Sequence, residues 1–142
     1  MAGIQPKRIA RPGVDEYGRT PLHYAAVDGD AKLVSKLLLE GANPNAADDR
    51  GWVPLHCAAQ AISGQVTAIL LSAGANIEAK DVYGNTPLHR AVASSQGAGE
   101  VIILLRKAGA SATTTNNYGV SPLASAREVT NFDLAQFFTD LP

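Results

Sequence analysis

Hydrophobic residues recur at three- and four-residue intervals in three separate stretches of this 142-residue chain. The stretches are Leu33, Val34, Leu37 and Leu38; Val66, Ile69, Leu70 and Leu71; and Val101, Ile102, Leu104 and Leu105. Because residues three and four apart share one side of a helix, each stretch predicts a helix with a buried stripe. A Gly-Ala pair follows each stretch, at residues 41–42, 74–75 and 109–110, where glycine can end a helix in the left-handed conformation.

A shorter hydrophobic segment precedes each stretch and begins with a recurring polar phrase. The first instance reads Tyr-Gly-Arg-Thr-Pro-Leu-His over residues 17–23, and variants follow at 51–56, 83–89 and 118–123. The glycine of each phrase can take the positive φ of a tight turn. Thr20, Thr86 and Ser121 then stand where a helix N-cap is favoured, each followed by proline. The phrase therefore predicts a turn and a short inner helix, such as residues 22–27.

The phrases repeat at an almost fixed interval, because their glycines lie 33, 33 and 35 positions apart (18 to 51, 51 to 84 and 84 to 119). A period near 33 with Thr-Pro-Leu-His resembles the ankyrin repeat family, from about Asp15 to the end of the chain. The resemblance implies an all-α fold, an ankyrin-repeat solenoid of four helix-turn-helix repeats joined by β-turn or hairpin loops. We place the repeats at about residues 15–47, 48–80, 81–115 and 116–142.

Residues 1–14 fall outside the repeats, and we interpret them as a flexible basic arm. They carry Lys7, Arg8 and Arg11 without any acidic residue, and two prolines interrupt any periodicity. Several roles stay open for this arm. It could be a disordered leader, a contact for an acidic partner, a weak nuclear signal, or a lid laid over the first repeat by Ile4 and Ile9.

The fourth repeat departs from the pattern in a way that suits an end. Ala124 stands in place of the repeated histidine, and Arg127 stands where Ala26 stands in the first repeat. Terminal repeats of a solenoid need a polar outer face. We therefore expect the solenoid to end here, and the chain to be whole rather than a fragment.

Two further irregularities affect the second and third repeats. Val53 occupies the place of the capping threonine, and a missing cap costs about 1 kcal/mol. We predict that Val53→Thr raises the melting temperature, unless a neighbour buries Val53. The third repeat has two extra residues between its helices, within the small polar segment 93–100, which we expect to be a mobile loop.

Composition narrows the class of protein. Hydrophobic residues make up 46% of the chain, and the formal net charge of −1 gives no general attraction to nucleic acid or anionic membranes. The only cysteine, Cys57, excludes an internal disulfide. The chain shows neither a signal peptide nor a membrane-spanning run. We expect a monomeric cytoplasmic protein that does not bind membranes, and nuclear entry stays open.

The repeated histidines raise the question of a metal site. His23, His56 and His89 occupy equivalent places in consecutive repeats, which lie about 10 Å apart, on the order of the distance between packed helices. Zinc needs ligands about 2 Å from one point, so this spacing argues against a shared metal. The resemblance implies instead that each histidine ties one turn to the next. Cys57 has no suitable base beside it, and we predict no enzyme activity and no cofactor.

The resemblance also implies where a partner protein binds, namely a concave face of turn tips and inner helices. Residues that differ between repeats on that face are the candidate contacts. They are Tyr17, Arg19, Asp28, Asp49, Arg50, Trp52, Gln60, Val82, Tyr83, Asn85, Arg90, Ser94 and Tyr118.

Among these candidates, the aromatic and arginine residues stand out, because interface hot spots favour Trp, Tyr and Arg. Trp52, the only tryptophan, falls in a turn slot that we expect to be exposed. The alternative is that the tyrosines pack on neighbouring turns and hold the tips together. When Glu16 and Glu128 of the same face are counted with the candidates, acidic residues slightly outnumber basic ones. That balance favours a protein partner with a basic element and fits direct nucleic-acid binding poorly.

We predict a non-catalytic interaction module that acts as a small inhibitor or neutraliser by occupying its partner. A stand-alone stack of four repeats resembles cyclin-dependent kinase inhibitors and the bacterial immunity proteins that block a toxin. One alternative is an adaptor that uses the arm or the Ser94–Glu100 loop as a second site. Another is a regulator associated with nucleic-acid-binding proteins. The irregular repeats argue against an engineered consensus binder.

Overall fold

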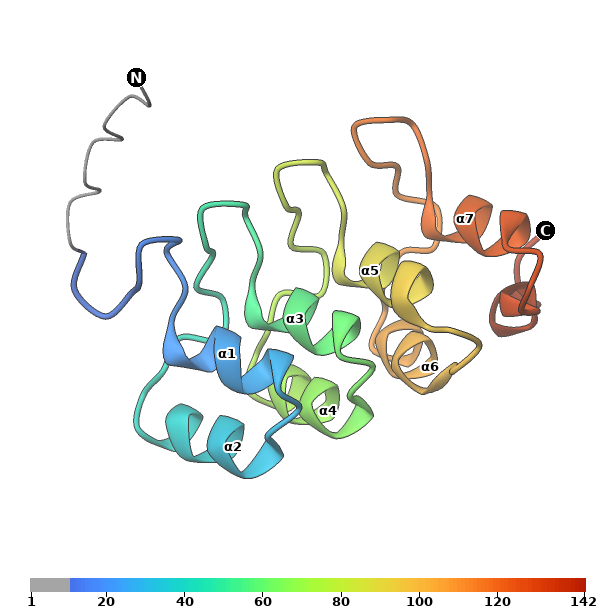
Figure 1. The fold of residues 1–142 in the computed structure, drawn as a ribbon. Coiled ribbons are helices and arrows are strands. Elements are labelled where there is room, and N and C mark those ends of the chain that lie inside the picture. Colours follow the sequence, from blue (N-terminus) through green and yellow to red (C-terminus); the bar gives the residue numbers. More distant parts are fainter. Residues whose placement is uncertain (1–10) are drawn as a thin grey trace, which may run out of the picture.

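The computed structural model describes residues 11–142, which form seven α-helices and one 3-10 helix arranged as four successive pairs (Figure 1). The inner helices are α1 (Pro21–Val27), α3 (Pro54–Gln60), α5 (Pro87–Ser94) and α7 (Pro122–Glu128). The outer elements are α2 (Ala31–Leu39), α4 (Gly64–Ser72), α6 (Glu100–Lys107) and the 3-10 helix η1 (Leu134–Phe138). The predicted all-α solenoid is confirmed. Most of the predicted basic arm lies outside the described residues.

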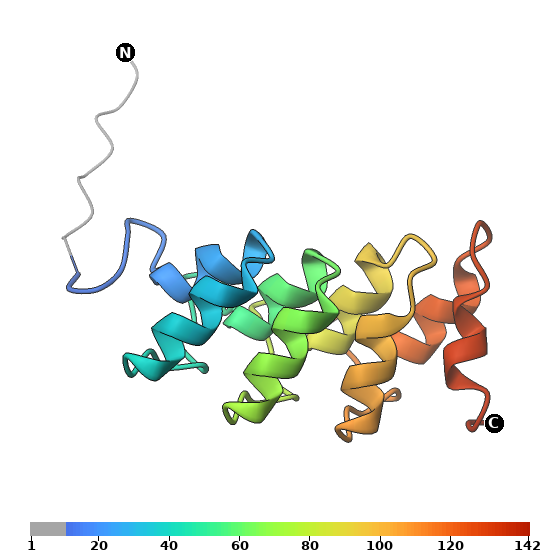
Figure 2. The same cartoon turned by 90° about the horizontal axis from the view of Figure 1, so that it is seen from below.

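The pairs stand side by side, with the first and last at opposite ends of the stack (Figure 2). Four loops project beyond the inner helices on one side of the molecule (Figure 1). We call residues 15–20, 48–53, 81–86 and 116–121 the first to fourth loops. The surface made by these loops and the exposed sides of the inner helices is called the concave face below. Within residues 11–142, no helix is long and apolar enough to cross a membrane.

Side chains at the N-caps start the inner helices as expected. The Oγ1 atoms of Thr20 and Thr86 accept hydrogen bonds from the third helical amide, and Ser121 does the same in α7. The side chain of Val53 has no hydrogen-bond acceptor, and the residue is buried, with 4% of its surface exposed. The condition stated with the Val53→Thr prediction, burial of Val53 by a neighbour, is therefore met. However, Thr86 is equally buried at the matching position, with 1% exposed, and still makes its bonds.

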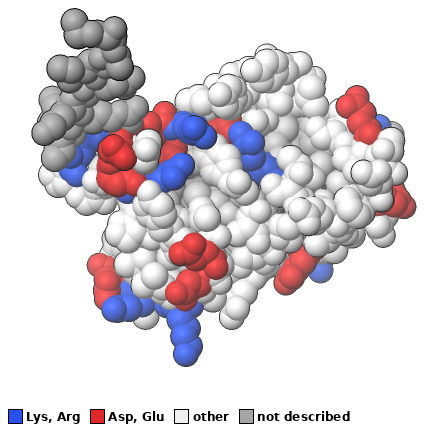
Figure 3. All heavy atoms as spheres, viewed as in Figure 1, with Lys and Arg blue, Asp and Glu red and all other residues white. Residues whose placement is uncertain are grey.

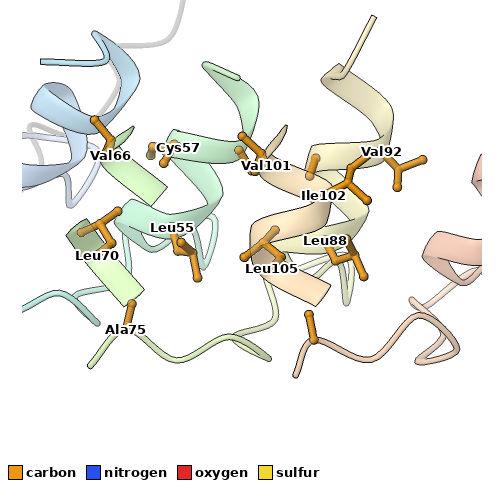
Figure 4. Packing of buried hydrophobic residues seen from close by; sticks show 14 of the residues in the cluster. Leu55, Cys57, Val66, Leu70, Ala75, Leu88, Val92, Val101, Ile102 and Leu105 are labelled. Carbon is orange, nitrogen blue, oxygen red and sulfur yellow. The ribbon is translucent and has the colours of Figure 1, made fainter. Parts of the chain in front are cut away.

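Hydrophobic side chains from adjacent pairs meet to form one continuous core (Figure 4). Leu55 of α3, Leu70 of α4, Leu88 of α5 and Leu105 of α6 are completely buried there. The stripe predicted on the first outer helix is only partly buried, because Leu33 is 38% exposed. An end pair has a neighbour on one side only, so one flank of its stripe faces solvent.

The last pair, at the other end of the stack, differs from the expected pair of α-helices. Its outer element is a 3-10 helix, whose Leu134 and Phe138 are buried. Arg127 is exposed, whereas Ala26 at the equivalent position of α1 is completely buried. Polar character at Arg127 therefore fits a position that no further pair covers within the described residues.

The long connection between α5 and α6 is packed against the last pair. A Cβ atom at Gly97 would lie 2.8 Å from the ring of Phe132, and one at Gly99 would overlap the ring of Phe137. Ser95 in the same connection is buried, with 2% exposed. Aromatic residues more than 30 positions later therefore lie against its backbone, and the mobility that the sequence led us to expect stays a prediction.

Candidate interaction surface on the concave face

Each loop is folded around the side chain at its first position. Asp48 Oδ1 accepts hydrogen bonds from the backbone N–H of Arg50 at 2.9 Å and of Trp52 at 2.8 Å. In the other loops, the equivalent oxygens accept from the amides two and four residues later, and they belong to Asp15, Asp81 and Asn116. These bonds satisfy amides that would otherwise depend on water, so the loop tips have a defined shape.

Backbone hydrogen bonds also join each loop to the preceding one. The amide at the second position of a loop donates to the carbonyl at the third position of the loop before it. The three bonds, each 2.9 Å long, run from Asp49 to Tyr17, from Val82 to Arg50 and from Asn117 to Tyr83. The four loops therefore form one hydrogen-bonded ribbon along the edge of the stack.

The repeated histidines tie the inner helices to this ribbon. Their Nε2 atoms lie 2.8–2.9 Å from backbone carbonyls of the following loop, with the pairs His23 and Trp52, His56 and Asn85, and His89 and Val120. Their Nδ1 atoms accept from the N-cap amide at 3.0–3.1 Å. Since Nδ1 accepts, each ring is neutral and Nε2–H donates to the carbonyl. The role implied by the family resemblance is confirmed.

Burial adds an electrostatic reason for the neutral rings. It lowers the pKa of His56 and of His89 below the ordinary value of 6.5, because a charged imidazole is poorly solvated there. Protonation at Nδ1 would also place a second hydrogen against the N-cap amide. Among residues 11–142, no three His, Cys, Asp or Glu side chains are grouped so as to hold a metal ion.

Trp52 is half-buried, which corrects the expectation that its turn slot is exposed. The Arg90 guanidinium carbon lies 4.7 Å from the centroid of the indole, within the range of a cation–π contact. The ring of His56 lies 5.8 Å away on a tilted plane. Trp52 is therefore held in a fixed position by a side chain from the next repeat.

Asp81 fixes Arg90 in turn. Its carboxylate is completely buried and accepts a 2.7 Å hydrogen bond from Arg90 Nη2. Burial alone would raise the pKa of Asp81, but the bonds from Arg90 and from two loop amides hold this pKa below its usual range. The result is a chain of contacts from Asp81 through Arg90 to Trp52.

A hollow of about 400 Å³ lies where these side chains meet the loops. Its lining residues are Arg19, Asp48, Arg50, Trp52, Gln60, Tyr83, Arg90 and Ser94. All of them except Asp48 are among the candidates that the sequence suggested. The sequence therefore located much of one surface, although it could not show that these residues surround a common space.

The other candidates lie outside this hollow. Tyr17, Val82 and Tyr118 are exposed on the loop tips, and Asp28 is exposed at the end of α1. Asp49 forms an ion pair with Arg11 at 2.9 Å. Asn85 is part of the scaffold, because its carbonyl accepts from His56 and its Oδ1 accepts from Asn116 Nδ2. A second, smaller hollow of about 160 Å³ adjoins the first and is lined partly by Tyr24.

Charge on this face is concentrated near the first loops, where acidic and basic side chains are mixed (Figure 3). Lys and Arg side chains and Asp and Glu side chains lie together beside the earlier loops, whereas the surface over the later repeats carries few charges in this view (Figure 3). Asp48 and Asp81 turn inward, and their side chains are 4% and 0% exposed. The expected acidic excess came from Glu16, Asp28, Asp49 and Glu128, which are exposed, so it did not depend on these two acids.

Asp48 was missed as a site residue, because the sequence shows it only as the first residue of a turn. It lines the hollow and lies 3.6 Å from Arg19 Nε, so it both shapes the loop and positions a neighbouring guanidinium. Its place beside Asp49, Arg50 and Trp52 in the sequence was the available signal.

Comparison with known proteins gives one family. The family model for ankyrin repeats in three copies matches residues 22–117, which is 96 of the 142 residues. No curated protein matches the chain.

Proposed function

The chain belongs to the ankyrin repeat family, whose repeats act as protein-interaction modules, and we propose that it binds a partner protein through its concave face and inhibits it. The observation that carries this proposal is the hollow lined by Trp52, Tyr83 and three arginines. Its size and lining suit one or two side chains of a protein partner.

The chemistry of the hollow is that of an interface centre. Hot spots of protein interfaces are enriched in Trp, Tyr and Arg, which combine a large apolar area with a polar tip. Tyr83 leaves 48% of its surface exposed, so a partner would bury much more of it. Arg50 is exposed beside it at the rim.

The hydrogen-bonded ribbon of loops supports tight binding. A surface that is already ordered loses less conformational entropy on association than a flexible one does. Asp48, Asp81 and the loop-to-loop bonds fix the backbone on which Trp52 and Tyr83 are mounted. The partner therefore meets contact residues that are already in place.

Inhibition by occupancy is the mode of action that this surface supports, because the side chains considered for catalysis are buried or already hydrogen-bonded. Burial raises the pKa of Cys57 to about 12, so its thiol is a poor nucleophile at neutral pH. The histidine rings of the first three repeats are engaged at both nitrogens. The adaptor alternative assigned a second site to the Ser94–Glu100 loop, and part of that loop is covered by Phe132 and Phe137.

Two matched tyrosines test the proposal. Tyr83 and Tyr118 occupy the same slot of consecutive loops, and both are exposed, but only Tyr83 lines the hollow. Tagged wild type, Tyr83→Ala and Tyr118→Ala would be used to capture partners from the native host. We expect Tyr83→Ala to weaken capture of one stoichiometric partner by about 2 kcal/mol, which is roughly thirtyfold.

The captured partner then separates inhibition from bridging. Its activity should fall to a low level at a 1:1 ratio with the wild-type protein, and Tyr83→Ala should relieve that inhibition. Equal loss of capture in both tyrosine variants would argue against the hollow as the site. A partner whose activity is unchanged in a stable complex would favour an adaptor.

A further inference from the structure

Three guanidinium groups surround the hollow, and two of them are paired with acids whose side chains are almost completely buried. Arg19 contacts Asp48, and Arg90 contacts Asp81. Within residues 11–142, the Arg50 guanidinium has no hydrogen bond or ion pair. Three cations and two anions therefore leave an excess of one positive charge around the hollow.

Exposure makes that excess larger at the mouth of the hollow than the charge count suggests. The side chains of Arg19 and Arg90 are 37% and 25% exposed, whereas those of Asp48 and Asp81 are 4% and 0% exposed. The Oδ1 atom of each acid also accepts hydrogen bonds from two loop amides. A group entering from solvent therefore meets guanidinium donors rather than carboxylates.

We infer that the hollow is an anion-binding pocket that receives an acidic side chain of the partner protein, either a carboxylate or a phosphate. This inference rests on the proposed function and specifies the partner's chemistry. It reverses the expectation of a basic partner element. Arg50 supplies the free charge, and Arg90 holds Trp52 as an apolar wall beside the bound group.

Guanidinium groups suit this task because they present several N–H donors in one plane and can hold a carboxylate or phosphate in a two-point contact. Arg90 uses Nη2 for Asp81, and no described residue accepts from its buried Nε. The pocket also offers Tyr83 and Trp52 to apolar neighbours of the acidic residue. The fitting partner is thus an acidic segment with adjacent hydrophobic side chains.

The single tryptophan provides a direct readout, because Trp52 forms part of the pocket wall. The full chain would be titrated with tetraglutamate, with a phosphoserine tripeptide and with tetralysine, while tryptophan fluorescence is recorded. We expect a saturable change with at least one acidic peptide and none with tetralysine. The binding should weaken when salt is raised from about 50 mM to about 300 mM. The stronger of the two acidic peptides identifies carboxylate or phosphate as the preferred group.

Arg50→Gln is the decisive variant, because Arg50 is exposed and only its backbone contributes to the loops. It should weaken the acidic peptide about tenfold, as expected for loss of a hydrogen bond to a charged group. Lys107→Gln removes an equal charge from the exposed end of α6 and should leave binding unchanged.

Several results would overturn the inference. They are no saturable response to either acidic peptide, an equal response to tetralysine, and equal affinity of Arg50→Gln and wild type. Tighter binding of a single-stranded oligonucleotide, insensitive to Arg50→Gln, would point to nucleic acid instead. If acidic peptides fail while Tyr83→Ala still abolishes capture, the proposed function stands and the anion pocket does not. If they bind while Tyr83→Ala captures normally, the pocket stands and the proposed partner surface does not.

Discussion

The N-caps of the second and third inner helices offer a matched pair of substitutions, Val53→Thr and Thr86→Val. Both positions are buried, with 4% and 1% exposed, and each precedes a histidine at the third helical position. Thr86 Oγ1 lies 2.9 Å from His89 Nδ1 and accepts from His89 N–H at 3.4 Å. Each substitution exchanges a methyl group for a hydroxyl or the reverse, in the same local geometry.

The expected magnitudes follow from those contacts. Thr86→Val loses two hydrogen bonds worth about 1 kcal/mol each and gains a buried methyl worth about 0.8 kcal/mol, a net loss of about 1 kcal/mol. Val53→Thr gains less, because His56 N–H already donates to Val53 O at 3.0 Å. After loss of the methyl, the net stabilisation is about 0.5 kcal/mol at most.

Urea unfolding followed by circular dichroism would measure both variants against wild type. The midpoint should move in opposite directions for the two substitutions, with an unchanged slope that indicates the same surface exposed on unfolding. If Val53→Thr lowers the midpoint, burial of the hydroxyl outweighs its new bonds. If Thr86→Val is neutral or stabilising, the bonds seen at Thr86 contribute nothing to stability, and the reasoning fails for both positions.

Three further predictions concern pH, the thiol and the loops. His56 and His89 have pKa values lowered by burial, so the unfolded chain binds more protons below about pH 6.5 and the free energy of unfolding should fall as pH drops from 7.5 to 5. Urea midpoints at the two pH values measure this, and equal midpoints would contradict it. Cys57, with a pKa of about 12 and 4% exposure, should react with a thiol reagent only after urea unfolds the chain, and rapid labelling of native protein would refute its burial. Gly51→Ala should destabilise more than Gly41→Ala in thermal unfolding. Both glycines have positive φ, but only at Gly51 would the new Cβ lie 2.9 Å from the backbone of the next loop. Equal melting temperatures would show that this contact relaxes freely.

Local spacing was sufficient to predict the seven α-helices of the described residues, although not the 3-10 helix. The prolines at 21, 54, 87 and 122 mark the first residue of each inner helix. The glycines after each outer helix take positive φ, as at Gly41 and Gly74. These features depend on residues within a few positions of one another, so the sequence displays them directly. Burial of Leu55 and Leu88 follows from the same repeat, since an internal pair has neighbours on both sides.

Errors arose where a residue's surroundings come from another repeat. The third connection was interpreted as a small polar loop without a packing partner, yet Gly97 and Gly99 lie against Phe132 and Phe137. The full outer helix expected in the last repeat is a 3-10 helix instead. No local pattern announces these contacts, because they join positions that only the stacking of the last two pairs brings together.

The sequence by itself determined the repeat and the starts of the inner helices, because both follow from periodicity, and the family resemblance suggested the face on which varied residues gather. Only the tertiary structure decided which of those residues form a site. Arg90 lies over the ring of Trp52, which is 38 positions earlier in the sequence, and Asp81 forms an ion pair with Arg90. The same stacking withdrew Asp48 and Asp81 from solvent and left the arginines facing it. Charge counted along a chain therefore differs from charge presented at its surface, since burial and hydrogen bonding select which groups a partner can reach.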